Sequence, residues 1–424
     1  MLEIILKVLK KNNIDEYIIT ETEKDGVELY LIKKDLDMNR KKDTTIYTLT
    51  VFRKIKDGEE VLKGDSTVII YPSMDEGEIE EVIKSAYYAA SFVKNKVYEI
   101  PKGYSGEIVV KKNKLSDFSL DEIALRTKNA LYKYDNFEKG FINSAEIFVT
   151  KVKKRIITSK GADASYEKCS INGEFITQWV ENQDVEIYNS FSYEDLEEEE
   201  LSLKAKEAIE NTGYRDKSQK APKTGNYDVI LSGDNVQTIF SYYLDNSLTS
   251  MVYQKYSKFN VGDNIQGNEI KGDKIGITIT SSVPFSNEGI ELKNHVLIED
   301  GVLKTLYGSY KFAEYLGLEP IGDHDGAIVN GGKTSFEEMF KDGNLKILRF
   351  SDFQMDTLTG DFYGEIRLAL LKQGNNIIPL TGGSMSANIK DVQENIILSK
   401  ELQKDGAFTL PLGIKFSNVK ISGI

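Results

Sequence analysis

The chain has 424 residues, of which 40% are hydrophobic and 29% are charged, and its formal net charge is −13 at pH 7. This length allows about two or three domains with sizeable cores. The acidic balance argues against direct binding to nucleic acid, which needs clustered Lys and Arg. The chain has no apolar run of about 18 residues that would span a membrane, and its single cysteine, Cys169, fits a reducing compartment. The sequence therefore predicts a cytoplasmic globular protein without a membrane partner.

The first part of the chain predicts a helix, several strands and a second helix. The opening residues 1–13 predict a helix, because charged residues interrupt the apolar run that a secretory signal would need. Period-two alternation and β-branched residues predict strands at 16–24, 27–35, 45–55 and 66–72. Helical period follows over 73–93, and Ser73 and Glu76 have the spacing of a capping box at its start.

The same order of elements then recurs. A helix is expected from Ser119, with Glu122 completing a second capping box. Strands are expected at 145–160, 164–173, 174–183 and 184–193, and a helix from about Leu196. The four glutamates 197–200 favour the positive end of that helix dipole, which indicates a solvated helix start. Strands followed by a helix, repeated about twice, predict a mixed α/β domain over residues 1–220, and the polar segment 215–228 is the expected linker.

The second part, residues 221–424, is expected to be a β-rich domain with a curled or barrel-like sheet, so the whole chain is assigned to the α+β class. A helix over 232–248 opens it, with an apolar face and with four polar residues expected to point outward: Gln237, Ser241, Asp245 and Asn246. Strands are expected within 272–283, 294–310, 345–354, 364–380 and 411–424, and one short helix at 309–318. Gly- and Asn-containing turns separate the strands.

Residues able to perform chemistry are few. The only histidines, His295 and His324, are 29 residues apart, and neither lies on a predicted helix, whereas zinc hydrolases commonly place two histidines on one helix. A metal site built from both histidines and a carboxylate remains an alternative to a hydrogen-bonded turn histidine at His324. Cys169 is expected to be a small buried residue. The sequence contains no G-x-S-x-G elbow and no phosphate-binding loop.

Three segments of the C-terminal part resemble the TldD/PmbA family, bacterial and archaeal proteins once named modulators of DNA gyrase. "VPFSNEGI" at 283–290 resembles the family's P-x-D-x-E-G turn, with Ser286 in place of the acid. "MDTLTGDF" at 355–362 resembles its TGDF turn. "IIPLTGGSMSANIKDVQENI" at 377–396 resembles a further family segment, with Asn388 and Asp391 in matching places. The N-terminal order of helix, strand and hairpin also fits the family.

The resemblance implies a choice between two branches. TldD-type members resemble metalloproteases and open their C-terminal domain with an H-E-x-x-x-H helix, whereas PmbA-type members, also named TldE, lack it and pair with TldD in a protease. The counterpart helix here, 235–248, contains no His and no Glu. The resemblance therefore implies a PmbA/TldE-like, non-catalytic subunit of a TldD/TldE-type metalloprotease assembly that processes or degrades peptides. No catalytic residue, metal ligand or zinc cofactor is expected in this chain.

The expected partners are a TldD-type subunit or a second copy of the chain, together with an unfolded or extended peptide. Peptide binding by strand addition is expected along the C-terminal sheet or its loops. The candidate groove or turn residues are Asp356, Thr359, Gly360, Asp361, Gly382, Gly383 and Asn388. Two alternatives stay open: an active metallopeptidase with an atypical site, and a stand-alone binding or scaffold protein that forms homo-oligomers.

Overall fold

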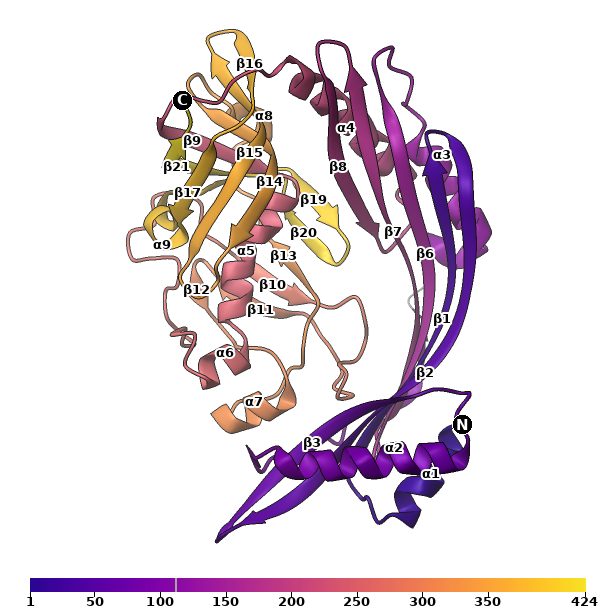
Figure 1. Ribbon diagram of the computed structural model, residues 1–424. Helices are drawn as coiled ribbons and strands as arrows, with labels where there is room; N and C mark the ends of the chain where they lie inside the picture. The colour runs from indigo at the N-terminus through magenta and orange to yellow at the C-terminus, as the bar shows by residue number, and fades with distance from the viewer. Residues whose placement is uncertain (111–112) are drawn as a thin grey trace.

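The N-terminal part of the molecule is built on one long curved sheet (Figure 1). The computed structural model describes residues 1–110 and 113–424. The strands of this sheet are β1 (Tyr17–Ile32), β2 (Asp35–Asp57), β3 (Glu60–Ile70), β4 (Asn95–Lys96), β5 (Ser105–Val110), β6 (Gly140–Thr158), β7 (Asp163–Val180) and β8 (Asp184–Tyr193). Their order is β4-β3-β2-β1-β6-β7-β5, and β8 also pairs with β7. The two strand-then-helix repeats thus share a single sheet, joined where β1 pairs with β6.

Two pairs of expected strands are each a single strand in the structure. The segments 16–24 and 27–35 were expected as separate strands, but residues 17–32 form the single strand β1, in which Gly26 pairs with Lys42 on one side and with Thr150 on the other. The expected strands 164–173 and 174–183 likewise merge in β7. The separate-strand prediction is wrong because partners on both sides hold the backbone extended through a residue that locally favours a turn.

Four helices accompany the sheet: α1 (Leu2–Lys11), α2 (Glu76–Ala89), α3 (Leu120–Leu131) and α4 (Glu198–Lys217). The capping box of α3, formed by Ser119 and Glu122, is confirmed. The predicted start of α2 is wrong, since its capping box uses Asp75 and Glu78. The preceding residues form a turn closed by the Met74 N–H on the Tyr71 carbonyl (3.0 Å), which keeps Ser73 outside the helix.

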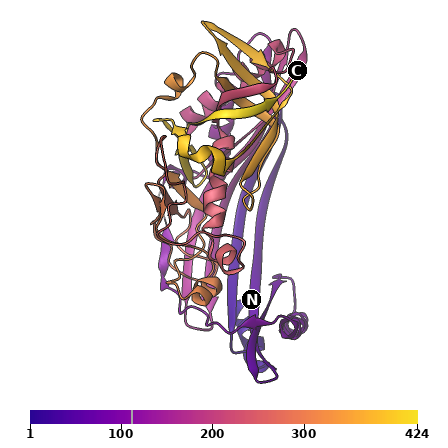
Figure 2. The same ribbon diagram turned by 90° about the vertical axis from the view of Figure 1, so that its left-hand side faces the viewer.

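The helices cover one face of the sheet and the C-terminal elements lie on the other. Ile19 packs with α1 and α2, and Val27 packs with α3 and α4. Alternate residues of a strand point to opposite faces, so these two odd-numbered residues of β1 share a face. Ile18, on the opposite face, packs with Phe285 of the C-terminal part. Figure 2 shows the C-terminal elements as a second layer beside the long strands.

The C-terminal layer contains a closed barrel. Its elements are β9 (Gly225–Ser232), α5 (Asp234–Asn246), α6 (Thr249–Tyr253), β10 (Ile277–Thr280), β11 (His295–Glu299), β12 (Val302–Leu303), α7 (Tyr310–Leu316), β13 (Gly326–Val329), α8 (Phe336–Met339), β14 (Leu345–Met355), β15 (Asp361–Gln373), β16 (Asn376–Leu380), β17 (Ser384–Asn388), α9 (Ile389–Val392), β18 (Ile397–Leu398), β19 (Leu402–Asp405), β20 (Phe408–Pro411) and β21 (Gly413–Ser422). The path β14-β9-β21-β17-β15 returns to β14 and closes five strands. This confirms the expected barrel-like sheet in an α+β fold. A second sheet follows the order β12-β11-β10-β13-β20-β19, and its β19–β20 hairpin was not predicted.

The two layers are joined by apolar and main-chain contacts. Ile187 of β8 packs against three leucines of β14 and β15, namely Leu348, Leu368 and Leu370. The expected linker is shorter than predicted, because α4 continues to Lys217. The remaining part of this segment is held by a main-chain hydrogen bond, in which the Ile424 N–H donates to the Pro222 carbonyl at 3.0 Å. No helix within residues 1–110 and 113–424 combines the length and apolar character needed to cross a bilayer.

Candidate functional site

Helix α5, the counterpart of the catalytic helix implied by the family resemblance, is enclosed by the C-terminal layer. Val236, Ile239, Phe240 and Tyr243 have no exposed surface. Asn246 was expected to point outward, but it is only 4% exposed. Its amide donates to the carbonyls of Tyr242 (2.9 Å) and Thr357 (2.6 Å). That prediction is wrong because the turn between β14 and β15 covers the end of the helix.

The polar residues of α5 do not fit zinc. None of its 13 residues is a His, Cys or Glu, and zinc is held by imidazole, thiolate and carboxylate groups that converge from several directions. The Ser241 hydroxyl donates a hydrogen bond to the Thr238 carbonyl of its own helix (2.7 Å). The one carboxylate on the inner part of the helix is Asp245; burial raises its pKa, and a hydrogen bond from Thr357 opposes this rise.

Five of the seven predicted groove residues meet in the β14–β15 turn. Asp356 Oδ1 accepts the N–H groups of Leu358 (2.9 Å) and Thr359 (3.3 Å), and these bonds lower its pKa. The Asn388 amide donates to the Thr359 carbonyl (3.1 Å) and to Asp361 Oδ1 (2.8 Å). Gly360 has φ +86, and a Cβ there would lie 3.0 Å from Ile389. Most of these polar groups already have partners inside the turn.

The remaining two predicted residues, Gly382 and Gly383, lie elsewhere along β15. The Gly382 N–H donates to the Ile366 carbonyl (2.8 Å), and the Gly383 carbonyl accepts the Ile366 N–H (2.9 Å). Ile366 is five residues along the strand from Asp361, a distance of about 17 Å. A Cβ on Gly383 would lie 2.5 Å from the Ser422 carbonyl oxygen, so close backbone packing requires glycine there. The seven residues therefore do not form one site, and their role in peptide binding stays a prediction.

The structure brings the two histidines together without forming a metal centre. The rings of His295 and His324 lie 5.8 Å apart between centroids. The nitrogens of His324 face the carbonyls of Lys293 (2.7 Å) and Gly322 (3.2 Å). Burial, followed by the neighbouring His324, lowers the pKa of His295. Among the residues that the structure describes, no three His, Cys, Asp or Glu side chains are arranged to hold a metal ion.

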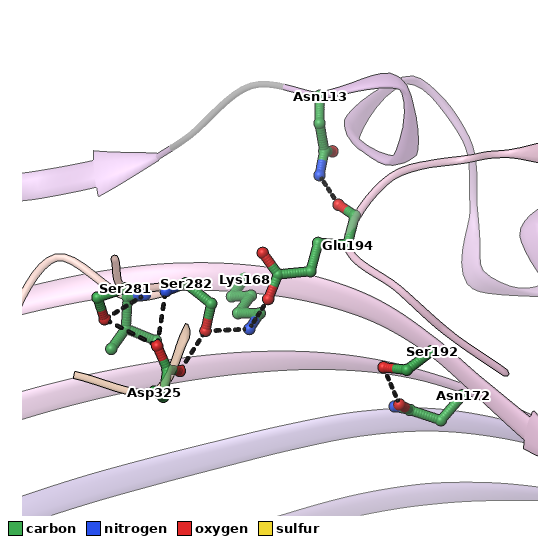
Figure 3. Close-up of polar contacts among 9 residues, drawn as sticks. Asn113, Lys168, Asn172, Ser192, Glu194, Ser281, Ser282 and Asp325 are labelled. Carbon is green, nitrogen blue, oxygen red and sulfur yellow. Dashed lines mark hydrogen bonds and ion pairs between the residues drawn. The ribbon is translucent and has the colours of Figure 1, made fainter. Parts of the chain in front are cut away.

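A polar bridge links the long sheet to the C-terminal layer (Figure 3). Lys168 of β7 donates to Glu194 Oε1 (2.6 Å) and to Ser282 Oγ (2.6 Å). The Ser282 hydroxyl donates to Asp325, which also accepts the Ser281 hydroxyl (3.0 Å). Burial acts to raise the pKa of Asp325, but the hydrogen bonds from Ser282 and the charge of Lys168 hold it below the usual value. Lys168 is a donor in both contacts, so it offers no base to activate Ser282, and the bridge is a structural link.

Sequence reasoning missed this bridge. Lys168 occupies an ordinary polar position of an alternating strand, and Ser282 lies 114 residues further along the chain. No local pattern connects them, because only the packing of the second layer on the sheet makes them neighbours.

The bridge borders a cavity of about 700 Å³ between the two layers, here termed the interlayer cavity. Its walls include Lys168, Tyr193 and Glu197 from the sheet layer and Ser282, Asn294 and Lys404 from the C-terminal layer. Cys169 also lines it and is half-buried rather than fully buried. Burial raises the pKa of the Cys169 thiol to about 11, so the side chain is a neutral thiol at pH 7.

The sequence is similar to a known family model and to a curated protein. Residues 224–423 match the family model described as the PmbA/TldA metallopeptidase C-terminal domain. A curated protein named Metalloprotease, from Methanothermobacter thermautotrophicus, is 30% identical over 161 residues, which are 32% of this chain and 35% of that protein. The chain thus aligns with about a third of the length of this relative.

Two solved structures share the fold. TldE from Thermococcus kodakarensis has a TM-score of 0.80 at 16% identity, covering 99% of this chain and 100% of that one. A protein from Thermotoga maritima, described as a candidate modulator of a DNA gyrase, has a TM-score of 0.77 at 18% identity and covers 99% of both chains. The likeness therefore extends over both layers of the structure.

Proposed function

Because residues 224–423 match the PmbA/TldA metallopeptidase C-terminal domain model, we propose that the chain is a subunit without its own catalytic metal in a TldD/TldE-type peptidase assembly. The observation that carries the proposal is the composition of α5. This helix has no His, Cys or Glu to hold zinc, and both histidines of the chain lie in other elements. The partner would be a TldD-type subunit that supplies the H-E-x-x-x-H helix, and the substrate an unfolded or extended peptide.

Strand β8 offers an open edge on which such a peptide could add. The Ser192 carbonyl accepts the Gly406 N–H (2.9 Å), and the Glu186 carbonyl accepts the Arg367 guanidinium (3.4 Å). These contacts show that the main-chain groups of even-numbered residues point away from β7. Between them, Tyr188 and Ser190 have no main-chain partner on this side among the described residues. An extended peptide would satisfy these groups irrespective of its side chains.

The assembly is tested by co-expression with a TldD-type chain from the same organism. The two chains are expected to co-purify, to hold zinc at about one ion per TldD-type chain, and to cleave an unfolded peptide. This chain alone is expected to hold no stoichiometric zinc by elemental analysis and to leave the peptide intact. About one tightly held zinc per molecule of the isolated chain would overturn the proposal.

A variant lacking both histidines separates the proposal from an atypical metal site. His295→Ala combined with His324→Ala should leave peptide cleavage by the assembly unchanged, because neither ring is assigned a role in it. Loss of cleavage by a folded double variant would favour a metal centre at the histidine pair.

The peptide edge is tested by Ser190→Pro. Proline removes one outward N–H, and edge strands tolerate it where that group faces solvent. We expect peptide affinity, measured by fluorescence anisotropy, to fall by about tenfold, as the loss of a main-chain hydrogen bond predicts. Ser190→Ala, which keeps the N–H, is the matched control and should bind as the unmodified chain does.

A further inference from the structure

Besides the interlayer cavity, the two layers enclose a second cavity of about 520 Å³. It lies on the face of the long sheet from which Ile18 packs against the C-terminal layer. Thr20, Thr22 and Lys154 line it from the sheet, and Asn287 lines it from the C-terminal layer. Ligand pockets commonly enclose about 300–1,000 Å³ and use a few polar groups to orient the ligand. The second cavity is therefore large enough for a small organic acid or the end of a peptide.

The charges in the second cavity favour an anion at mildly acidic pH. Two lysines, Lys154 and Lys311, and two acids, Asp65 and Glu288, line it. Asp65 already accepts the Asn95 amide at 2.9 Å. Burial raises the pKa of Glu288 to about 7, so most of this group is the neutral acid at pH 6. Two ammonium groups then face one carboxylate, although the chain as a whole is acidic.

Lys154 is a half-buried cation without a counter-ion. Its Nζ donates to Asn287 Oδ1 at 2.6 Å, and it forms no ion pair with a carboxylate in the part of the chain that the structure describes. Burial, followed by the charge of Lys24, lowers the pKa of Lys154, so its surroundings disfavour the ammonium form. An ammonium has three N–H donors. One of them is used by Asn287, so two remain for a ligand in the cavity.

Two threonines beside Lys154 also indicate a ligand. Thr22 of β1 pairs with Lys154 of β6, and Thr20 lies two residues away on the same face of β1. Thr20 is only 9% exposed and lines the cavity, yet neither hydroxyl makes a hydrogen bond to another described residue. Thr50 lines the same cavity and, by contrast, shares a hydrogen bond with Thr67 (2.8 Å). Buried hydroxyl groups are usually paired, so Thr20 and Thr22 indicate a ligand that accepts hydrogen bonds.

We propose that the second cavity binds a carboxylate, which pairs with the Lys154 ammonium and accepts hydrogen bonds from the Thr20 and Thr22 hydroxyl groups. An ionised carboxylate has two acceptor oxygens and no donor, which suits donors that lie side by side on two paired strands. No Arg is among the described residues that line the cavity, and the guanidinium group is the best match for phosphate. The carboxylate can come from a peptide C-terminus or from an acidic side chain. The site belongs to this chain alone, so it is expected whether or not the chain joins a peptidase assembly.

The test is calorimetric titration of the full chain at pH 6. Nα-acetyl-alanine carries a terminal carboxylate, and Nα-acetyl-glutamic acid α-amide carries only a side-chain carboxylate. Nα-acetyl-alanine amide carries neither and should not bind, and inorganic phosphate should bind more weakly than a carboxylate probe. Binding of the first probe alone identifies a peptide C-terminus, binding of the second alone identifies an acidic side chain, and binding of both supports a general carboxylate site. Failure of both carboxylate probes to bind, or tighter binding of phosphate, overturns the proposal.

Variants connect the binding to the cavity wall. Lys154→Met and Thr20→Val should each weaken carboxylate binding by about tenfold, the effect expected for one hydrogen bond to a charged group. Thr20→Val keeps the shape of the side chain and removes a hydroxyl without a partner, so the variant should fold with an unchanged melting temperature. Lys153→Met and Thr45→Val are matched controls on β6 and β2, because these side chains point to the opposite face of the sheet. Both controls should bind as the unmodified chain does. Unchanged binding in both Lys154→Met and Thr20→Val would refute the assignment.

Discussion

Glu288 provides a quantitative test of the packing between the layers. Its carboxylate accepts the Tyr310 N–H at the start of α7 (2.8 Å), and it lines a second cavity between the layers, of about 520 Å³. Burial raises the pKa of Glu288 from 4.5 to about 7. The Tyr310 N–H and the charge of Lys311 oppose this rise, whereas the charge of Asp323 supports it.

The raised pKa of Glu288 makes the free energy of unfolding depend on pH. The folded protein keeps the Glu288 proton up to about pH 7, whereas the unfolded chain loses it near pH 4.5. The free energy of unfolding therefore decreases as pH rises from 4.5 to 7, and the decrease is complete above pH 7. Each pH unit between the two pKa values changes the free energy of unfolding by about 1.36 kcal/mol, so ionisation of Glu288 lowers that free energy by about 3 kcal/mol.

Glu288→Gln removes this cost, because glutamine resembles the protonated acid. At pH 8 the variant is expected to be more stable than the unmodified chain by about 3 kcal/mol, and at pH 5 by less than about 1 kcal/mol. Urea unfolding followed by far-ultraviolet circular dichroism at both pH values measures the difference. Glu291→Gln, at an exposed site on the same loop, is the control and should show no such pH dependence. An equal effect of Glu288→Gln at pH 5 and pH 8 would refute the reasoning.

Three further predictions concern the other features. Lys168→Met breaks the polar bridge, and amide exchange of segment 281–282 should accelerate by about tenfold in mass spectrometry, since hydrogen bonds to charged groups contribute about 1.5–3 kcal/mol. Asn388→Ala removes the bonds that close the β14–β15 turn and should lower the free energy of unfolding by about 1–2 kcal/mol in urea. Cys169, whose pKa is raised to about 11, should react with iodoacetamide at pH 8 about 100-fold more slowly in the folded protein than in urea.

The two variants each have a matched control. Lys151→Met breaks an exposed ion pair on the neighbouring strand and should leave exchange at 281–282 unchanged. Asn375→Ala, in an exposed hairpin turn, should leave stability unchanged. Equal alkylation rates of folded and unfolded Cys169 would show that the thiol is not shielded between the layers.

Local sequence patterns identified most elements of the fold but not their lengths. The alternation of 184–193 predicts β8 with its observed ends, and the Ser119–Glu122 spacing predicts the start of α3. The pattern fails at Gly26, where the structure continues one strand through an expected break. It also fails at α2, whose capping box lies two residues later than expected. At Gly26 the strand partners on both sides, which are distant in sequence, keep the backbone extended, whereas at α2 a local turn between Tyr71 and Met74 delays the start of the helix.

The candidate site residues were also predicted only in part from local sequence. The turn residues around Gly360 could be recognised because all the groups that close the turn lie within one hairpin and the strand paired to it. Gly382 and Gly383 were grouped with them by composition, but strand length separates them.

The sequence by itself determined the α+β class, the amphipathic helices and the absence of His, Cys and Glu from α5, since periodicity and residue type depend only on local order. The tertiary structure alone decided which groups meet between the layers. Lys168 and Ser282 are brought together by the docking of the C-terminal layer against the curved sheet, and the hydrogen bond between them depends on that docking. The chemistry available to this protein therefore depends on contacts between residues that are more than a hundred positions apart in sequence.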